Sequence, residues 1–188
     1  VTALAGLHEG VIDPLIPLSS PCRGGYPFGN RVFHCHKRDG HGTLVLRDAM
    51  ARSCDIYFYQ VGIRLGVERL TRYAVACSVG VPTRVDLPQE RSGLVPTIDW
   101  YRAARGGPPG PGAALNLSIG QGELLLTPIQ LARLAAAVAN GGALVRPRVL
   151  RDVLDRDGNR MGAASVGGES AGRLPATEME LVIVRSAL

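Results

Sequence analysis

The chain has 188 residues, of which 46% are hydrophobic, and a formal net charge of +5. Its length is in the usual range for one domain, and its apolar content is sufficient for a buried core. No uninterrupted apolar run reaches the roughly 18 to 20 residues that a membrane-spanning helix needs. The arginines are spread from Arg23 to Arg185 without a basic stripe interleaved with aromatic residues, which argues against a nucleic-acid partner.

The first part of the chain is predicted to be a short helix followed by an irregular segment. Residues 1–9 have the spacing of the end of a helix, and Gly10 supplies a stop. Residues 13–42 contain prolines, glycines, two cysteines and three histidines in place of any periodicity. Such a segment needs another source of order, and a bound metal is the simplest candidate.

Three helices are predicted to follow in succession. Thr43 can cap a short helix that runs through Met50. A second helix is predicted over residues 56–65 and a third over 67–77, with Gly66 between them.

The next part of the chain breaks this helical pattern. Residues 80–112 lack periodicity, and the Gly- and Pro-rich end of this stretch, residues 105–112, is predicted to be a surface loop. Residues 114–119 are a short strand candidate that ends at Gly120. Thr127 and Pro128 then form an N-cap and N1 pair for a helix that ends at Asn140.

The last part is predicted to contain one strand or hairpin arm and a final helix. Residues 144–155 alternate well enough for a strand, with a turn at Asp157 and Gly158. Residues 162–172 are small and polar, which predicts a flexible loop. Residues 178–188 have a helical pattern that stops without a cap, so we expect the chain to be cut at both ends.

The stretch Ser53-Cys54-Asp55 lies between the first two of these predicted helices. On its own, a Ser-x-Asp sequence is only a helix-capping pattern. Its surroundings give it a second interpretation. Residues 115–132, LNLSIGQGELLLTPIQLA, are followed by the sequence ANGG at residues 139–142. They resemble the segment by which class B penicillin-binding proteins are identified.

Two further segments resemble the same family in the same order. They are VDLP at residues 85–88 and GLVP at residues 93–96, the latter followed by Trp100. The resemblance is to the monofunctional, elongation-type members. It implies an α+β fold, a partial penicillin-binding transpeptidase domain over residues 1–188, with an antiparallel sheet flanked by helices and outer strands missing at both ends.

Members of this family form an acyl-enzyme on the serine of a Ser-x-x-Lys motif. A Ser-x-Asn motif lines one side of their active site, and a Lys-Thr-Gly strand lines the other. Ser53 and Asp55 match the first and third positions of the middle motif, with Asp in place of Asn. The resemblance implies that Ser53 relays a proton and that Asp55 accepts a hydrogen bond from the catalytic lysine. The replacement puts contact of this position with the substrate carbonyl in doubt.

The other two motifs are absent from the sequence, whose single lysine is Lys37. The resemblance places the nucleophile a few residues before Val1 and the Lys-Thr-Gly strand beyond Leu188. The chain alone is therefore predicted to be inactive. The parent enzyme would cross-link peptidoglycan stem peptides, bind β-lactams and work with a membrane glycosyltransferase on the outer side of the bacterial cytoplasmic membrane, through an anchor outside this chain. The alternative is a catalytically silent, zinc-stabilised binding or scaffold domain.

The second set of candidate residues is Cys22, Cys35, His41 and Cys54. Four cysteines in an exported protein also suggest disulfides, or one disulfide and two free thiols. Three of them with His41 instead make a complete tetrahedral zinc site, in the part of the chain that lacks other organising features. We expect a structural zinc that orders residues 14–54.

The spacing of Cys35, Gly40, His41 and Cys54 resembles a metal-binding subgroup of the elongation-type proteins. The first two ligand positions of that subgroup are Asp or Cys, so thiolates there would make the site more zinc-selective. His34 and His36 flank Cys35 and are expected to face solvent or to support the site, although either could replace Cys22. Cys77 is expected to be a small buried thiol.

Overall fold

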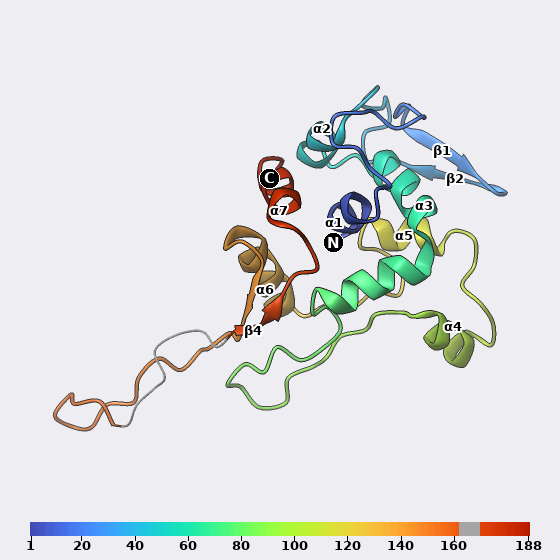
Figure 1. Ribbon diagram of the computed structural model, residues 1–188. Coiled ribbons are helices and arrows are strands. Elements are labelled where there is room, and N and C mark those ends of the chain that lie inside the picture. Colours follow the sequence, from blue (N-terminus) through green and yellow to red (C-terminus); the bar gives the residue numbers. More distant parts are fainter. Residues whose placement is uncertain (162–169) are drawn as a thin grey trace.

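The computed structural model describes residues 1–161 and 170–188. It is an α+β structure of seven helices and two small antiparallel sheets within these residues, as the sequence predicted (Figure 1). The elements in chain order are α1 (Thr2–His8), β1 (Gly25–Phe28), β2 (Arg31–His34), α2 (Leu46–Ala51), α3 (Asp55–Ala76), α4 (Ile98–Arg105), α5 (Ala113–Ser118), α6 (Pro128–Ala139), β3 (Ala143–Val145), β4 (Ser170–Arg173) and α7 (Glu178–Arg185).

The core is built around α3, which runs through the middle of the molecule beside α1 and α5 (Figure 1). Leu4, Ile56 and Leu115 are almost fully buried between these three helices. Helix α5 comes close to α3 at Gly62, where an added Cβ would lie 2.6 Å from both the Ala114 carbonyl oxygen and the Ser118 Cβ. The glycine is therefore needed for the close approach of the two helices.

One helix was predicted on each side of Gly66, and the structure confirms the break between them. Gly66 has φ +74° and ψ +167°, a non-helical conformation inside α3. Glycine adopts this left-handed φ without steric cost. The first half of α3 contacts residues 19–42, which we call the Cys/His segment. The second half is joined to α1 by Glu9, which accepts hydrogen bonds from Arg72 and Tyr73.

The prediction that residues 13–42 are wholly irregular was wrong. Strands β1 and β2 form a hairpin in the middle of this segment, with Phe28 opposite Arg31 and a two-residue turn between them. Gly29 has φ +61° in this turn, as a tight hairpin connection requires. The strands are short and none of their residues is fully buried, and they lack the alternating apolar pattern by which strands are found in a sequence.

The strand predicted over residues 114–119 was also wrong, because this segment is the helix α5. Ala114, Leu115 and Leu117 are buried, and packing against Gly62 of α3 decides the conformation where the short apolar run leaves it ambiguous.

Helix α4 was missed within residues 80–112, although signals for both of its ends are present. The Thr97 side chain accepts a hydrogen bond from the Trp100 backbone N–H, and Gly106 closes the helix in the left-handed conformation. The Gly- and Pro-rich sequence that follows obscured these signals.

The helices predicted near the C-terminus are confirmed, and both begin with a capping box. Thr127 and Gln130 form the box of α6, with Pro128 in the first turn, while Thr177 and Glu180 form that of α7. Helix α2 begins at Leu46 after the N-cap Val45, so Thr43 does not cap it as predicted.

Residues 143–161 contain strand β3 and an arm that extends away from the helices (Figure 1). The strand predicted over residues 144–155 was mostly wrong, because β3 ends at Val145. The predicted turn is confirmed, since Gly158 has φ +83° and Leu154 pairs with Arg160 across it. Of the loop predicted over 162–172, residues 162–169 lie outside the described part of the chain, and residues 170–172 belong to β4, which pairs with β3. None of the helices described is long and apolar enough to cross a membrane.

Candidate active site and metal centre

Ser53 lies in the tight turn that joins α2 to α3. The Ser53 N–H donates to the Met50 carbonyl (2.9 Å) and the Cys54 N–H donates to the Ala49 carbonyl (2.8 Å). These two bonds form a Schellman motif after the C-cap residue Arg52. The motif reverses the chain sharply and places Ser53 at its outer corner.

Ser53 occupies the position of this motif that glycine usually fills. Its φ is +48°, in the left-handed region, and its side chain is exposed. A non-glycine residue held in this region costs about 1–3 kcal/mol. Ser53 does not cap α3, because the N-cap is Cys54 and makes no side-chain capping bond. Ser53 is therefore not the N-cap of α3, and it is the residue after the C-cap of α2 instead.

Asp55 begins α3 two residues after Ser53. One of its carboxylate oxygens, Oδ2, accepts a hydrogen bond from the His36 backbone N–H (2.9 Å) and lies 3.6 Å from His36 Nδ1. The side chain is 24% exposed. Asp55 therefore ties the Cys/His segment to the first turn of α3 and remains in contact with solvent.

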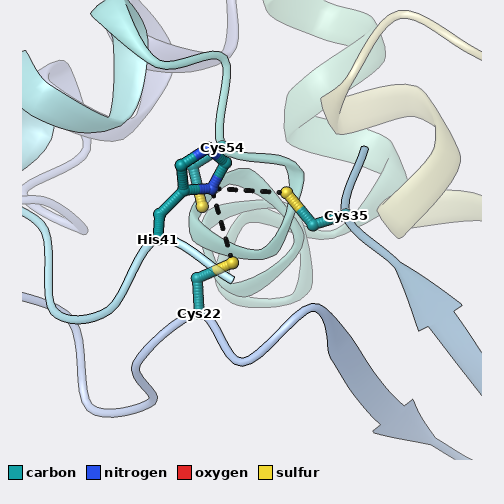
Figure 2. A group of neighbouring side chains, drawn as sticks. All are labelled: Cys22, Cys35, His41 and Cys54. Carbon is teal, nitrogen blue, oxygen red and sulfur yellow. Dashed lines mark hydrogen bonds between the residues drawn. The ribbon is translucent and has the colours of Figure 1, made fainter. Parts of the chain in front are cut away.

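The four predicted metal ligands come together on the other side of this turn. The ligand atoms of Cys22, Cys35, His41 and Cys54 all lie within 4.8 Å of one another, and Figure 2 shows the three sulfur atoms around the His41 ring. The His41 Nδ1 atom lies 3.5 Å from the sulfur of Cys22 and 3.5 Å from that of Cys35. All four cysteines of the chain are free and buried.

These distances fit a zinc ion. In a tetrahedral site with Zn–S bonds of about 2.3 Å and Zn–N bonds of about 2.0–2.1 Å, a sulfur and a nitrogen ligand lie about 3.6 Å apart. The 3.5 Å separations at His41 Nδ1 match this value. Three thiols and one imidazole are also the donor set that zinc prefers, and four of them would complete its coordination.

Two glycines allow the backbone to bring these ligands together. Gly24 and Gly40 both have φ near +80°. An added Cβ at Gly24 would lie 1.7 Å from the Arg38 carbonyl oxygen, and one at Gly40 would lie 2.1 Å from the Cys22 carbonyl oxygen. Cys22 also pairs with Gly42 through two backbone hydrogen bonds of 2.8 and 2.9 Å. A side chain at either glycine would therefore separate the ligand loops.

The electrostatics of the cluster suit a divalent cation. Burial raises the pKa of Cys54 to about 12 and also raises that of Cys35, so both thiols stay protonated at neutral pH without a nearby cation. Burial likewise opposes ionisation of Cys22, but hydrogen bonds to Gly24, His41 and the neighbouring thiols outweigh it and lower its pKa. Burial and nearby positive charges lower the pKa of His41, which keeps the imidazole neutral, as a metal ligand must be.

Sequence reasoning missed the residues that hold this segment on α3. The buried Gln60 side chain donates to the Ser20 carbonyl (2.9 Å) and accepts from the Ser20 N–H (3.0 Å). The Tyr59 hydroxyl donates to the His34 carbonyl (3.1 Å), and its ring packs edge-on against Phe33. Their positions on one face of α3 could have suggested packing, but nothing in the sequence identifies the partner segment.

The remaining histidines and the fourth cysteine lie where they were expected. His34 and His36 are exposed, and His36 Nδ1 lies 3.8 Å from the Cys35 sulfur, in a supporting position beside the four-residue cluster. Cys77 is 2% exposed and is not part of the cluster.

A sizeable pocket in the described part of the chain does not coincide with either candidate site. It has a volume of about 550 Å³ and lies beside α1, α3 and α6. Its lining is apolar, with Phe58, Leu70 and Leu134 among the residues that form it, and it contains no titratable side chain. Its polar side chains are the hydroxyls of Thr2, Thr71 and Ser118.

Comparison with known proteins identifies the family. Residues 1–181 match the model of the penicillin-binding protein transpeptidase domain. The peptidoglycan D,D-transpeptidase MrdA of Acinetobacter baumannii is 36% identical over 149 residues, which cover 79% of this chain and 22% of that protein. This chain thus spans about a fifth to a quarter of the length of the curated MrdA relatives that it matches.

Solved structures give the same result. Pseudomonas aeruginosa PBP2, determined in complex with WCK 5153, has 31% identity and a TM-score of 0.82, covering 99% of this chain and 41% of that one. A chain from a structure described as a peptidoglycan synthase complex that coordinates polymerization and crosslinking has 29% identity and a TM-score of 0.82, covering 100% and 30%. The chain belongs to the penicillin-binding protein transpeptidase domain family, and is of its elongation, PBP2/MrdA type.

Proposed function

We propose that the chain is part of a peptidoglycan D,D-transpeptidase that cross-links stem peptides through a serine acyl-enzyme. The observation that carries this proposal is the exposed hydroxyl of Ser53 at the corner of a strained turn, two residues before Asp55, in a domain of this family. The acylated serine would belong to a Ser-x-x-Lys motif, which this chain does not contain.

Ser53 and Asp55 would form one wall of the catalytic cleft. The Ser53 hydroxyl would pass a proton between the base and the leaving amine, a positioned transfer worth about 10² to 10⁴ in rate. Asp55 would accept a hydrogen bond from the catalytic lysine through its Oδ1, since Oδ2 already accepts the His36 N–H. The Schellman turn keeps both groups at fixed positions relative to α3.

The Cys22, Cys35, His41 and Cys54 cluster would hold one structural zinc ion. The match between the His41-to-sulfur distances and tetrahedral zinc geometry supports this proposal. Four protein ligands would leave no open position for a reactive water, so the ion would supply structural order and no catalytic step. Through Cys54 it would fix Ser53 and Asp55 from the side opposite the cleft.

The substrates and partners follow from the same family. Donor and acceptor would be peptidoglycan stem peptides, and β-lactams would mimic the donor. The solved synthase complex supports a glycosyltransferase partner that polymerises the glycan. Because the peptidoglycan lies outside the cytoplasmic membrane, we place this domain on the outer side of that membrane.

Acylation by benzylpenicillin tests the proposal directly. Intact mass after incubation should show no adduct on this chain, and one acyl group on a longer protein that contains both missing motifs. In that longer protein Ser53→Ala should slow acylation by about 10² to 10⁴. A stoichiometric adduct on Ser53, or an unchanged acylation rate in Ser53→Ala, would contradict the assigned roles.

A catalytically silent, zinc-stabilised scaffold domain is the second candidate for the chain. The grouped side chains of Cys22, Cys35, His41 and Cys54, which need no catalytic role, favour this candidate. It predicts zinc binding without acylation even in the longer protein, so the benzylpenicillin experiment distinguishes the two.

A further inference from the structure

A second pocket lies on a different part of the molecule from Ser53. The loop after α3 and strand β4 form it with α6. In Figure 1 this loop and β4 lie well below α2. Its volume is about 430 Å³, within the range of small-molecule sites. The residues that line it are Ser78, Val81, Pro82, Thr83, Arg84, Arg133 and Ala171.

The unusual member of this lining is Arg133. It lies on α6, a helix otherwise rich in Ala and Leu, and only 6% of its surface is exposed. Its Nε atom is buried and has no hydrogen-bond partner among the described residues. An unpartnered buried donor costs about 1–3 kcal/mol, and more when the group is charged. Native proteins seldom keep such a group without a use for it.

Glu90 is the acidic residue whose charge acts on Arg133, but its oxygens are already occupied. Oε1 accepts from the Thr83 N–H and from the Thr83 hydroxyl, both at 2.6 Å, and Oε2 accepts from the Arg84 N–H at 2.8 Å. These bonds close the loop of residues 83–90. Glu90 therefore offsets part of the charge of Arg133 while leaving its N–H groups unused.

We propose that this pocket is a binding site for a carboxylate, held by the Arg133 guanidinium with Arg84 and the Ser78 hydroxyl beside it. A guanidinium presents paired N–H donors in a rigid fork that matches the two oxygens of a carboxylate. Arg84 and Arg133 outnumber Glu90 here, and Arg146 adds a further positive charge nearby, because its Nε donates to the Arg84 carbonyl. The site therefore carries a positive charge that a carboxylate would offset.

The pocket walls indicate the kind of carboxylate. Val81, Pro82 and Ala171 give the pocket apolar sides beside the guanidinium. A short aliphatic acid, either free or as the side chain of a glutamate in a peptide, combines these two features. The site is independent of the acyl-transfer chemistry proposed for Ser53.

NMR titration of the ¹⁵N-labelled, zinc-loaded chain tests this inference. The probes are butyrate, N-acetylglutamate amide and inorganic phosphate, each at constant ionic strength and pH 7.5. Both carboxylates should shift the Nε–H signal of Arg133 with saturation, and the tighter of the two identifies the free acid or the peptide side chain as the source. Phosphate should shift it about tenfold more weakly, because only the carboxylate probes can bury methylene groups against Val81, Pro82 and Ala171.

Three variants make the test specific. Arg133→Met removes the fork at similar volume and should abolish binding, Arg133→Lys should weaken it about tenfold, and the exposed Arg47→Met on α2 should leave it unchanged. If Arg133→Met does not fold, Arg84→Gln at the exposed rim should still weaken butyrate binding several-fold. No saturable shift with either carboxylate, equal binding in Arg133→Met, or tighter binding of phosphate would overturn the proposal.

Discussion

The Cys/His segment, residues 19–42, and the helical core of α1, α3 and α5 meet on the first half of α3, yet they are ordered by different forces. The core buries large apolar side chains such as Leu4 and Leu115. The Cys/His segment has little apolar surface to bury, and Val32 in its hairpin is 52% exposed. Its buried residues are Cys22, Gly24, Cys35 and Gly40, and its aromatic side chains are only partly buried. Burial accounts for the core, whereas we expect the segment to depend also on the proposed metal.

Removal of the metal should have the largest effect, and it should be confined to one of the two regions. Structural zinc contributes about 10–16 kcal/mol of apparent binding free energy in small peptide sites, far more than the contacts of this hairpin. His41→Ala or a chelator should therefore abolish amide protection in residues 19–42 and leave α1 and α5 protected. Hydrogen exchange with mass spectrometry measures both regions together.

Cys77→Ala is the control for this prediction, because Cys77 is as buried as the three cysteines of the cluster but lies outside it. It should retain one zinc ion per chain and full protection of the Cys/His segment. Loss of protection throughout the chain in His41→Ala, or none in either region, would remove the distinction between the two regions.

Overpacking of the helical core should produce the opposite pattern. Gly62→Ala places a methyl group 2.6 Å from atoms of α5, and such overpacking typically costs about 1–3 kcal/mol. Chemical denaturation should show this loss while zinc content stays at one per chain. Gly107→Ala, which has no atom within 4 Å of the added Cβ, should change the free energy of unfolding little. Loss of zinc from the folded Gly62→Ala protein would contradict the separation.

Ser53 lies where the two regions join, and its strain provides a smaller test. Ser53→Gly should stabilise the folded chain by about 1 kcal/mol, because it relieves the left-handed conformation at some cost in chain entropy. Ser53→Ala keeps the strain and should not stabilise it. In a longer, acylation-competent protein both variants should acylate slowly. A glycine variant that is less stable than the alanine variant would show that the turn is not strained.

The smallest effect is expected from the Glu9 contact that joins α1 to the second half of α3. A hydrogen bond from Tyr73, followed by the charges of Arg72 and Arg69, lowers the pKa of Glu9. A lowered pKa stabilises the fold above the unfolded value of about 4.3, and this contribution is lost as the pH falls through the folded-state value. Glu9→Gln should therefore reduce the loss of stability on acidification below about pH 4.3. An identical acid titration of the variant and the parent chain would contradict this role.

The sequence predicted the parts of the fold that carry local signals. The helix start at Thr127 and Pro128, the break at Gly66 and the grouping of Cys22, Cys35 and Cys54 with His41 all follow from residue type and spacing. These features depend on neighbours in the chain or on a donor set that few other functions share. Family resemblance supplied the role of Ser53, which spacing alone left as a helix cap.

The features that could not be predicted depend on contacts between distant segments. Helix α5 was predicted as a strand, because its conformation is decided by packing on Gly62. The β1–β2 hairpin was missed, because it lacks an apolar face of its own. The left-handed conformation of Ser53 comes from the Schellman turn, whose usual marker is a glycine. The unpartnered Arg133 also escapes sequence analysis, since only the folded chain buries it.

X-ray absorption at the zinc edge tests the central claim most directly, namely that Cys22, Cys35, His41 and Cys54 hold one zinc ion that orders the segment before Ser53. Protein purified without chelator should contain one zinc per chain, with three sulfur ligands at about 2.3 Å and one nitrogen ligand at about 2.0–2.1 Å. In His41→Ala the nitrogen ligand should be lost. Protein that contains no zinc, together with a Cys22–Cys35 disulfide in peptide mapping, would contradict the account.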